Sequence, residues 1–192
     1  MKETAETQKA RCAWVPLDKG DYVAYHDDEW GQPVHDDRLL FEMLMLEGAQ
    51  AGLSWYTVLR KRAAYRALFK NFDVKKVAQM TDAELKKILL DSRIVRNRLK
   101  VFSARQNARA FILIQKEFGS FDAYLTKMLG EKPIVHRALS MREMLVTIPE
   151  SEALAKDLKK RGMTFVGDSI MYAYLQAIGR VDDHMQGCYR AT

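Results

Sequence analysis

Two cysteines and two histidines near the ends of the chain have the types and spacing to bind one metal ion. Cys12 and His26 lie near the start, and His184 and Cys188 lie near the end. The second pair is four residues apart, so on a helical turn both side chains share a face. A Cys2His2 set fills the tetrahedral shell of zinc and leaves no position for water. The pattern therefore predicts a structural Zn²⁺ that joins the N- and C-terminal segments, rather than a hydrolytic metal.

Two other interpretations of these residues stay open at this point. Each side chain could simply be packed in the core, and the two cysteines could form a disulfide. The segment MKETAETQKA has no apolar stretch of the kind found in signal peptides, and nowhere do about 18 apolar residues follow one another. We therefore expect a cytoplasmic protein with no membrane partner, and a reducing compartment favours metal thiolates over a disulfide.

An acidic residue surrounded by apolar and small residues is the second candidate for chemistry. Glu47 follows LLFEMLML and precedes GAQAG, and the first third of the chain also holds Trp14, Tyr25, Trp30 and Trp55. A carboxylate so placed is expected to be buried, and a buried charge requires a partner. That partner could be a cationic ligand held between aromatic rings. The alternative is that Glu47 pairs with an internal arginine or caps a helix, with the aromatic residues serving only as core.

Length, composition and charge set the outer limits. With 192 residues and 48% hydrophobic content the chain can bury a real core. We expect a polar tail over residues 1–10 and a single domain over residues 11–192. The net charge of +6 suits a polyanionic partner without establishing one. A monomer is the expected state.

Apolar residues recur at helical spacing nearly everywhere, and no alternating runs typical of strands occur, so the sequence predicts an all-α fold. Asp36 or Asp37 can cap a first helix, and Ser54 can begin a second that continues through Tyr65. Thr81 and Glu84 match a capping box. A long helix over about 96–118 ends at Gly119, and its basic residues are expected to form a solvated face.

The last third predicts two helices joined by a short turn. Ser151 is expected to cap a helix that ends at Gly162, residues 163–167 form the turn, and a second helix ends at Gly179. Such a hairpin can present backbone N–H groups and a helix N-terminus to a phosphate. Neighbouring basic residues, over 159–161, would add attraction to a DNA backbone. An ordinary helical hairpin with charged flanks fits the pattern equally well.

Several long motifs in this chain closely resemble 3-methyladenine DNA glycosylase I. They are RCAWV, AYHDDEWG, LFEML, LEGAQAGLSWYTVL, KKRGMTFVG and VDDHMQGC. In this order they extend from residue 11 to residue 188. The resemblance implies an all-α helix-hairpin-helix DNA glycosylase fold, with the hairpin at about 151–179. It also implies a zinc lobe formed by about 11–35 and 180–190, and the four Cys and His residues named above fall on the family's zinc positions.

The resemblance also assigns roles to individual residues. Glu47 falls at the family's base-recognising carboxylate, Tyr25 and Trp55 at aromatic positions of the base pocket, and Trp14 at another. We expect Trp30 to support the pocket or the zinc lobe rather than to contact the base. Where the family commonly has Asn, this chain has Asp182.

Two roles for Asp182 follow from its position. It could act on the reaction, by activating water or stabilising the sugar cation, and it is therefore a candidate catalytic residue together with Glu47. It could instead orient the neighbouring His184, which is the role we favour.

The implied function is excision of N3-methyladenine from alkylated double-stranded DNA, as a first step of base excision repair. The enzyme would rotate the nucleotide out of the duplex and hydrolyse its N-glycosidic bond. Bifunctional relatives use a lysine amine just after the hairpin, and this chain has Ser169 there, so we expect a monofunctional enzyme. The rival interpretations are a zinc-stabilised nucleic-acid-binding protein without catalysis and a zinc hydrolase, and four protein ligands argue against the latter.

Overall fold

The computed structural model describes residues 9–191, which form ten α-helices, one 3-10 turn and two short strands. Residues 1–8, most of the expected polar tail, lie outside that range. The helices are α1 (Gly20–Asp28), α2 (Asp37–Gln50), α3 (Trp55–Leu59), α4 (Arg62–Leu68), α5 (Val74–Ala78), α6 (Asp82–Ile88), α7 (Arg98–Phe118), α8 (Phe121–Leu129), α9 (Pro149–Lys160) and α10 (Asp168–Ala177). The turn is η2 (Lys70–Phe72), and the strands are β1 (Ile134–Val135) and β2 (Val181–Asp182).

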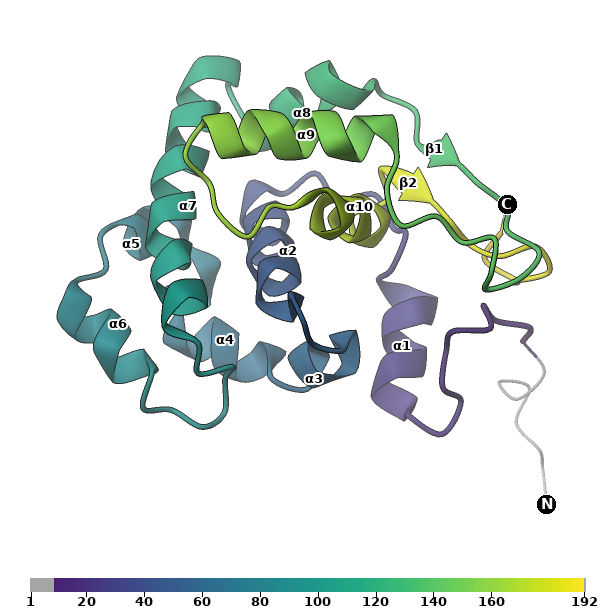
Figure 1. Cartoon of the computed structure of the whole chain (residues 1–192), viewed down its shortest axis with the longest axis horizontal. Helices are drawn as coiled ribbons and strands as arrows, with labels where there is room; N and C mark the ends of the chain where they lie inside the picture. The colour runs from purple at the N-terminus through teal and green to yellow at the C-terminus, as the bar shows by residue number, and fades with distance from the viewer. Residues whose placement is uncertain (1–8, 192) are drawn as a thin grey trace.

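Helix α2 lies at the centre of the molecule, with the other helices arranged around it (Figure 1). Every residue from Leu40 to Ala49 is buried. A helix that is buried around its whole circumference must be apolar on all sides, and the run LLFEMLML meets that requirement except at its acidic residues. Any polar group on this helix therefore needs a specific explanation.

Both ends of α2 are fixed by side chains. Asp36 caps the first turn, accepting a hydrogen bond from the backbone N–H of Leu39 at 2.9 Å. The neighbouring Asp37 has a different role, because its carboxylate accepts from the backbone N–H groups of Phe121 and Asp122 and so caps α8. At the other end, the ammonium of Lys100 donates to the carbonyl oxygens of Ala49 and Ala51, at 2.9 and 2.5 Å.

The basic residues of α7 form the expected solvated face only in part. Arg98 and Arg109 are exposed, whereas Lys100 and Arg105 are half-buried. Arg105 donates to the carbonyl of Met80, and Arg109 donates to the carbonyl of Ala78 at the end of α5. Together with Lys100, they bond carbonyls at or just beyond the C-terminal ends of α2 and α5. These cations therefore join neighbouring helices to α7.

Two predicted elements differ from the structure. The helix expected from Ser54 through Tyr65 is interrupted and forms α3 and α4. Helix α9 begins at Pro149 rather than after Ser151, because proline is well suited to the first helical position. Ser151 instead bonds the backbone of Ile148. The long helix and the capping box of Thr81 and Glu84 are confirmed, although the long helix begins at Arg98.

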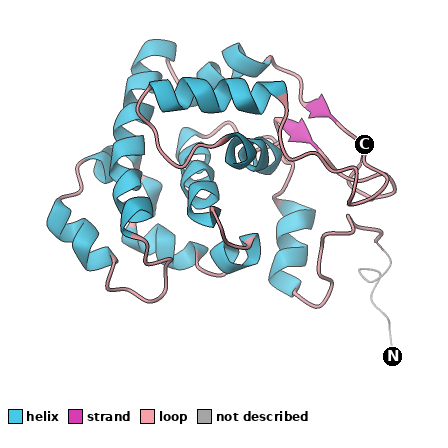
Figure 2. Cartoon of the chain, in the orientation of Figure 1, coloured by secondary structure: helices cyan, strands magenta, loops and turns pink. Residues whose placement is uncertain are grey.

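The fold is mostly helical rather than all-α. Strands β1 and β2 form a two-stranded parallel sheet in which Ile134 pairs with Val181 (Figure 2). Two-residue strands are too short to produce an alternating pattern in the sequence. The sheet positions the C-terminal segment beside the N-terminal segment. The two segments are joined there by a hydrogen bond from the backbone N–H of Tyr189 to the carbonyl of Ala10.

Helices α9 and α10 and the turn between them form the predicted helix, turn and helix. The turn is held by α7, where Asn107 both donates to the carbonyl of Thr164 and accepts from its N–H, each at 2.9 Å. It also lies directly against α2, since a Cβ on Gly48 would be 3.2 Å from Cβ and O of Phe165. The close backbone approach that small residues permit is therefore found at Gly48. Among the described residues, no helix has both the length and the apolar character of a membrane span.

Candidate functional site

Glu47 is a buried carboxyl group without a protein partner. Its side chain belongs to α2, is 3% exposed, and makes no hydrogen bond or ion pair with any described residue. The same helix offers a contrast in Glu42, which accepts from Nε of Arg62 at 2.6 Å and from Nε of Arg66 at 2.9 Å. The arginine pair that we considered for Glu47 is therefore made by Glu42. Glu47 is left open to a ligand.

Burial raises the pKa of Glu47 to about 8. The ionised form is disfavoured because no cation or hydrogen-bond donor replaces the water that the carboxylate loses. A cationic ligand beside the carboxyl would reverse this shift. The group can thus change its protonation state between the empty and the occupied site, which is a property common in functional sites.

Glu47 lies at a pocket of about 230 Å³ with mainly aromatic walls. Tyr25 and Trp55 stand 5.2 Å apart between ring centroids, and Trp14 completes this part of the wall. All four residues that the sequence predicted for a base pocket are therefore brought together. The pocket is lined by Trp14, Tyr22, Tyr25, Trp30, Glu47, Gln50, Trp55, Met141, Met144, Ala173 and Gln176.

Sequence reasoning missed several of these lining residues, and a helical signal was available for some. Tyr22 precedes Tyr25 by three residues on α1, and Gln50 follows Glu47 by three on α2. Such pairs share a helix face, so each missed residue could have been found from its neighbour. Met141 and Met144 lie in the segment between β1 and α9, for which no local pattern indicates a contact with α2.

Trp30 belongs both to the pocket wall and to the surroundings of the histidines. Its ring lies 4.9 Å from that of Trp14 and 4.7 Å from that of His184. The sequence led us to expect support for either the pocket or the zinc lobe. The structure shows one indole in contact with both.

Cys12, His26 and Cys188 form a buried cluster that could hold a metal ion. One ligating atom from each lies within 4.8 Å of the other two, and Nε2 of His26 is 3.5 Å from Sγ of Cys188. Both cysteines are free, so the disulfide alternative is not found. Nδ1 of His26 bonds the carboxylate of Asp27 at 2.8 Å, which is the arrangement that orients a metal-binding imidazole.

His184 lies beside this cluster but is not part of the three-residue group. Its ring centroid is 5.4 Å from that of His26, and its Nε2 is buried without a hydrogen bond. Nδ1 of His184 bonds Oδ1 of Asp182 at 2.8 Å, and Oδ2 of Asp182 accepts from Arg137 at 2.6 Å. An unpartnered Nε2 on an imidazole that a carboxylate orients fits a fourth ligand. Burial lowers the pKa of His26 and His184, which favours the neutral form that binds metal.

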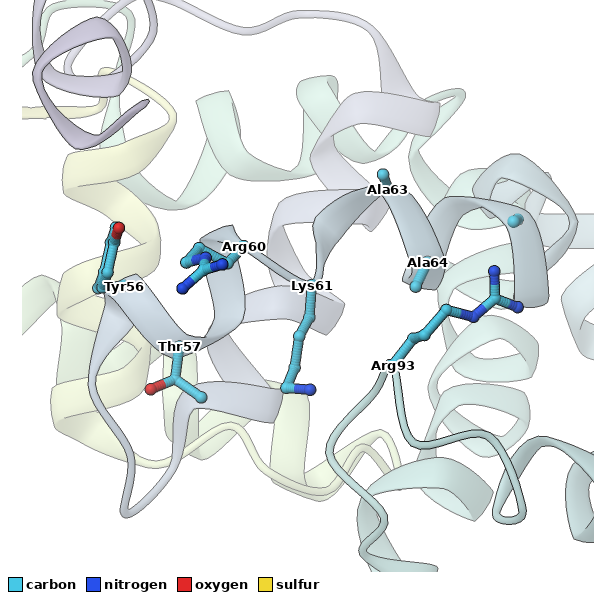
Figure 3. A pocket seen from close by; sticks show the side chains of 8 residues that line it. Tyr56, Thr57, Arg60, Lys61, Ala63, Ala64 and Arg93 are labelled. Carbon is cyan, nitrogen blue, oxygen red and sulfur yellow. The ribbon is translucent and has the colours of Figure 1, made fainter. Parts of the chain in front are cut away.

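A second depression, of about 670 Å³, is basic rather than aromatic. Tyr56, Arg60, Lys61 and Arg93 line it, with Tyr56 and Arg60 at one end and Arg93 at the other (Figure 3). It borders the aromatic pocket, since the ring of Tyr56 stacks on that of Tyr22 at 5.8 Å and 18°. Helix α3 thus contributes Trp55 to one pocket and Tyr56 to the other.

Comparison with known proteins identifies the family. A model of the family described as methyladenine glycosylase matches residues 14–191. The chain belongs to this family. It is 44% identical to DNA-3-methyladenine glycosylase 1 of Escherichia coli (strain K12) over 178 residues. These matched residues make up 93% of this chain and 95% of that protein.

Solved structures agree with this assignment to the methyladenine glycosylases. A crystal structure of 3-methyladenine DNA glycosylase I has a TM-score of 0.92 at 43% identity, covering 95% of this chain and 100% of that one. A structure of the Staphylococcus aureus 3-methyladenine DNA glycosylase I, described as the structural basis of 3-methyladenine recognition, has a TM-score of 0.90 at 33% identity and covers 95% and 96%. The resemblance carried by the sequence motifs is confirmed.

The raised pKa of Glu47 predicts a pH-dependent difference in stability between this methyladenine glycosylase and its Glu47→Gln variant. The folded pKa of about 8 exceeds the value of 4.5 for a free carboxyl. The favourable contribution of the protonated group is therefore complete below pH 4.5 and is lost as the pH rises through 8. We expect the variant to gain in free energy of unfolding relative to the parent by up to ~1.4 kcal/mol per pH unit in this range, as measured by urea unfolding at pH 5, 6.5 and 8. Asp28→Asn, at an exposed site, is the control, and a difference independent of pH would contradict the prediction.

Proposed function

We propose that this chain excises N3-methyladenine from alkylated DNA, with the methylated base bound in the aromatic pocket beside Glu47. The observation that carries the proposal is the buried and unpaired carboxyl of Glu47 at a pocket lined by Trp14, Tyr25 and Trp55. Family membership supports it, because relatives that are 44 and 42% identical are named DNA-3-methyladenine glycosylases.

The pocket suits a flat and electron-poor base. Methylation at N3 places positive charge on the adenine, which weakens the bond to the sugar and makes the base a good leaving group. Aromatic faces attract such a cation, and the carboxyl of Glu47 can bond it as a charge-assisted acceptor. Normal adenine is neutral and gains much less from both interactions. The positive charge of the methylated base therefore contributes both to its selective binding and to the cleavage of its bond to the sugar.

The reaction needs the nucleotide outside the duplex, because the bond to be hydrolysed is otherwise inaccessible. Hydrolysis then passes through a sugar with oxocarbenium character, which an anion can stabilise. Asp182 is engaged by Arg137 and His184, and these contacts support an orienting role for it rather than a catalytic one. Ser169 on α10 occupies the place of the lysine of bifunctional relatives, which supports hydrolysis without strand cleavage.

The DNA backbone would be held by two parts of the molecule. Helices α9 and α10 with their turn support the helix-hairpin-helix assignment, with the N-terminus of α10 facing a phosphate. The cations beside the turn are partly neutralised, since Lys159 pairs with Asp168 and Arg161 with Glu117. The basic depression around Arg60 and Lys61 is thus the stronger source of backbone attraction.

The metal would be a structural zinc ion bound by Cys12, His26, His184 and Cys188. Three ligands already cluster, and the buried Nε2 of His184 lacks any other partner. When bound, the ion would cross-link the two ends of the chain, and a full shell of four protein ligands excludes a reacting water. The cytoplasmic location and the monomeric state expected from the sequence stay predictions.

The central experiment measures release of free 3-methyladenine from methylated duplex DNA. We expect release by the parent chain, and a rate 10- to 100-fold lower for Glu47→Gln, because a hydrogen bond to a charged group is worth about 1.5–3 kcal/mol. Binding of free 3-methyladenine should weaken while the fold is retained. Asp28→Asn should behave like the parent. Undiminished release by Glu47→Gln would remove the carboxyl from its role, and strand breaks on a gel run without alkali would contradict a monofunctional enzyme.

The basic depression predicts a specific change in DNA binding. Replacing both Arg60 and Lys61 with Ala should weaken binding to duplex DNA and reduce the slope of log K against log salt by about 2, because each lost phosphate contact removes ~0.9. Binding of free 3-methyladenine should not change. The matched control replaces Lys86 and Lys87, two exposed lysines of α6, and fluorescence anisotropy at several salt concentrations reports the slopes. Equal slopes for the two double variants would rule out this surface.

The metal centre predicts that Cys188→Ser loses both bound zinc and stability. A structural zinc contributes several kcal/mol to folding, so the variant should unfold at a much lower temperature, and chelation of the parent should have the same effect. Elemental analysis and thermal unfolding measure the two quantities. Gln186→Ala, at an exposed position of the same segment, is the control. A Cys188→Ser variant that keeps its zinc, or that loses it without any change in stability, would show that the ion is not the structural element proposed.

A further inference from the structure

The side-chain amide of Gln176, a residue of the aromatic pocket, is held in one orientation by a neighbouring side chain. Gln176 lies on α10 and lines the aromatic pocket together with Glu47. Its side-chain amide nitrogen donates to Oδ2 of Asp183. Its amide oxygen accepts no hydrogen bond from any described residue and is not among the buried polar atoms that lack a partner. The oxygen is therefore accessible on a residue that lines the pocket.

Three side chains surround the carboxyl group of Asp183, one of them Gln176. The side chain of Asp183 is buried, the hydroxyl of Tyr172 donates to Oδ2, and Nδ1 of His136 bonds Oδ1 at 2.9 Å. Burial raises the pKa of Tyr172, which keeps the hydroxyl protonated and donating. A carboxylate in this setting would repel the amide oxygen of Gln176, so the amide nitrogen must face Asp183.

Gln50 shows that this constraint is particular to Gln176. It lines the same pocket, but none of the described residues holds its side-chain amide with a hydrogen bond. That amide can rotate to offer either a donor or an acceptor. Gln176 cannot rotate without replacing its hydrogen bond to the buried carboxyl group of Asp183 by a contact between two acceptor oxygens.

We propose that Gln176, positioned by Asp183, makes the pocket select purines that carry a 6-amino group over purines that carry a 6-oxo group. Adenine offers N6–H donors at this position, whereas guanine offers the O6 acceptor. The fixed oxygen of Gln176 accepts from the amino group and opposes a second acceptor. N3-methylguanine carries the same activating methyl group and positive charge as N3-methyladenine, so stacking and charge alone do not separate the two. The inference rests on the proposed function, because it needs the methylated base in this pocket.

The test compares the single-turnover rates at which 3-methyladenine and 3-methylguanine are released from the same methylated DNA. Gln176→Leu keeps the volume but removes the acceptor, and the ratio of the two rates should fall at least tenfold, mainly through slower release of 3-methyladenine. Asp183→Asn frees the amide of Gln176 to turn its nitrogen into the pocket, and here release of 3-methylguanine should increase. Asp28→Asn, at an exposed site away from this network, is the control, and its ratio should match that of the parent.

The outcomes separate this inference from the proposed function. A parent chain that releases no 3-methyladenine would overturn both. A parent that releases it, with an unchanged ratio in Gln176→Leu, would overturn only the selection by Gln176. If Gln176→Leu slowed the release of both bases equally, Gln176 would be a merely structural residue, and this result would also overturn the proposed selection. Thermal unfolding of each variant identifies a misfolded Asp183→Asn protein, and in that case Gln176→Leu decides alone.

Discussion

The fold depends on the burial of α2 around its whole circumference. A helix without a solvent face must be covered by other elements on every side, and α2 packs against α3, α7, α8, α10 and η2. Within such a helix, carboxyl groups are strongly destabilising unless they are paired. Glu42 is neutralised by Arg62 and Arg66. Glu47, five residues further on, has no cation beside it among the described residues, and this difference marks it as the candidate functional carboxyl of the helix.

The two ends of the chain meet at the cysteine and histidine cluster, and this cluster is also part of the pocket's support. Trp14 lies 5.2 Å from His26, and Trp30 lies 4.7 Å from His184, so two pocket walls rest on the two imidazoles. Gly31 allows this packing, because a Cβ there would be 2.6 Å from Cε1 of His184. The candidate metal centre and the proposed base pocket thus share a single layer of aromatic rings.

The sequence predicted the parts of the molecule that depend on local patterns. Helix ends marked by Asp36, by Thr81 with Glu84 and by Gly119 are where the residue types indicated, because capping is decided within one turn. Motif similarity brought Glu47, Tyr25 and Trp55 together before any geometry was known. The start of α9 had a local signal in Pro149, which the capping pattern of Ser151 obscured. The short strands and the interhelical bonds of Lys100 could not be predicted, because they depend on contacts between segments far apart in the chain.

Gly48 lets α2 and the turn between α9 and α10 approach each other closely. On one side of Gly48 is Phe165 in that turn, and next to Gly48 along α2 is Glu47. Phe165 itself has a φ of 58°, a left-handed conformation that a phenylalanine adopts at some cost. Because glycine has no side chain, nothing at this position lies between the turn and the helix to absorb a shift. In the proposed function the turn lies on DNA and Glu47 on the base, so a displacement of the turn on binding would act directly on the part of α2 that carries Glu47.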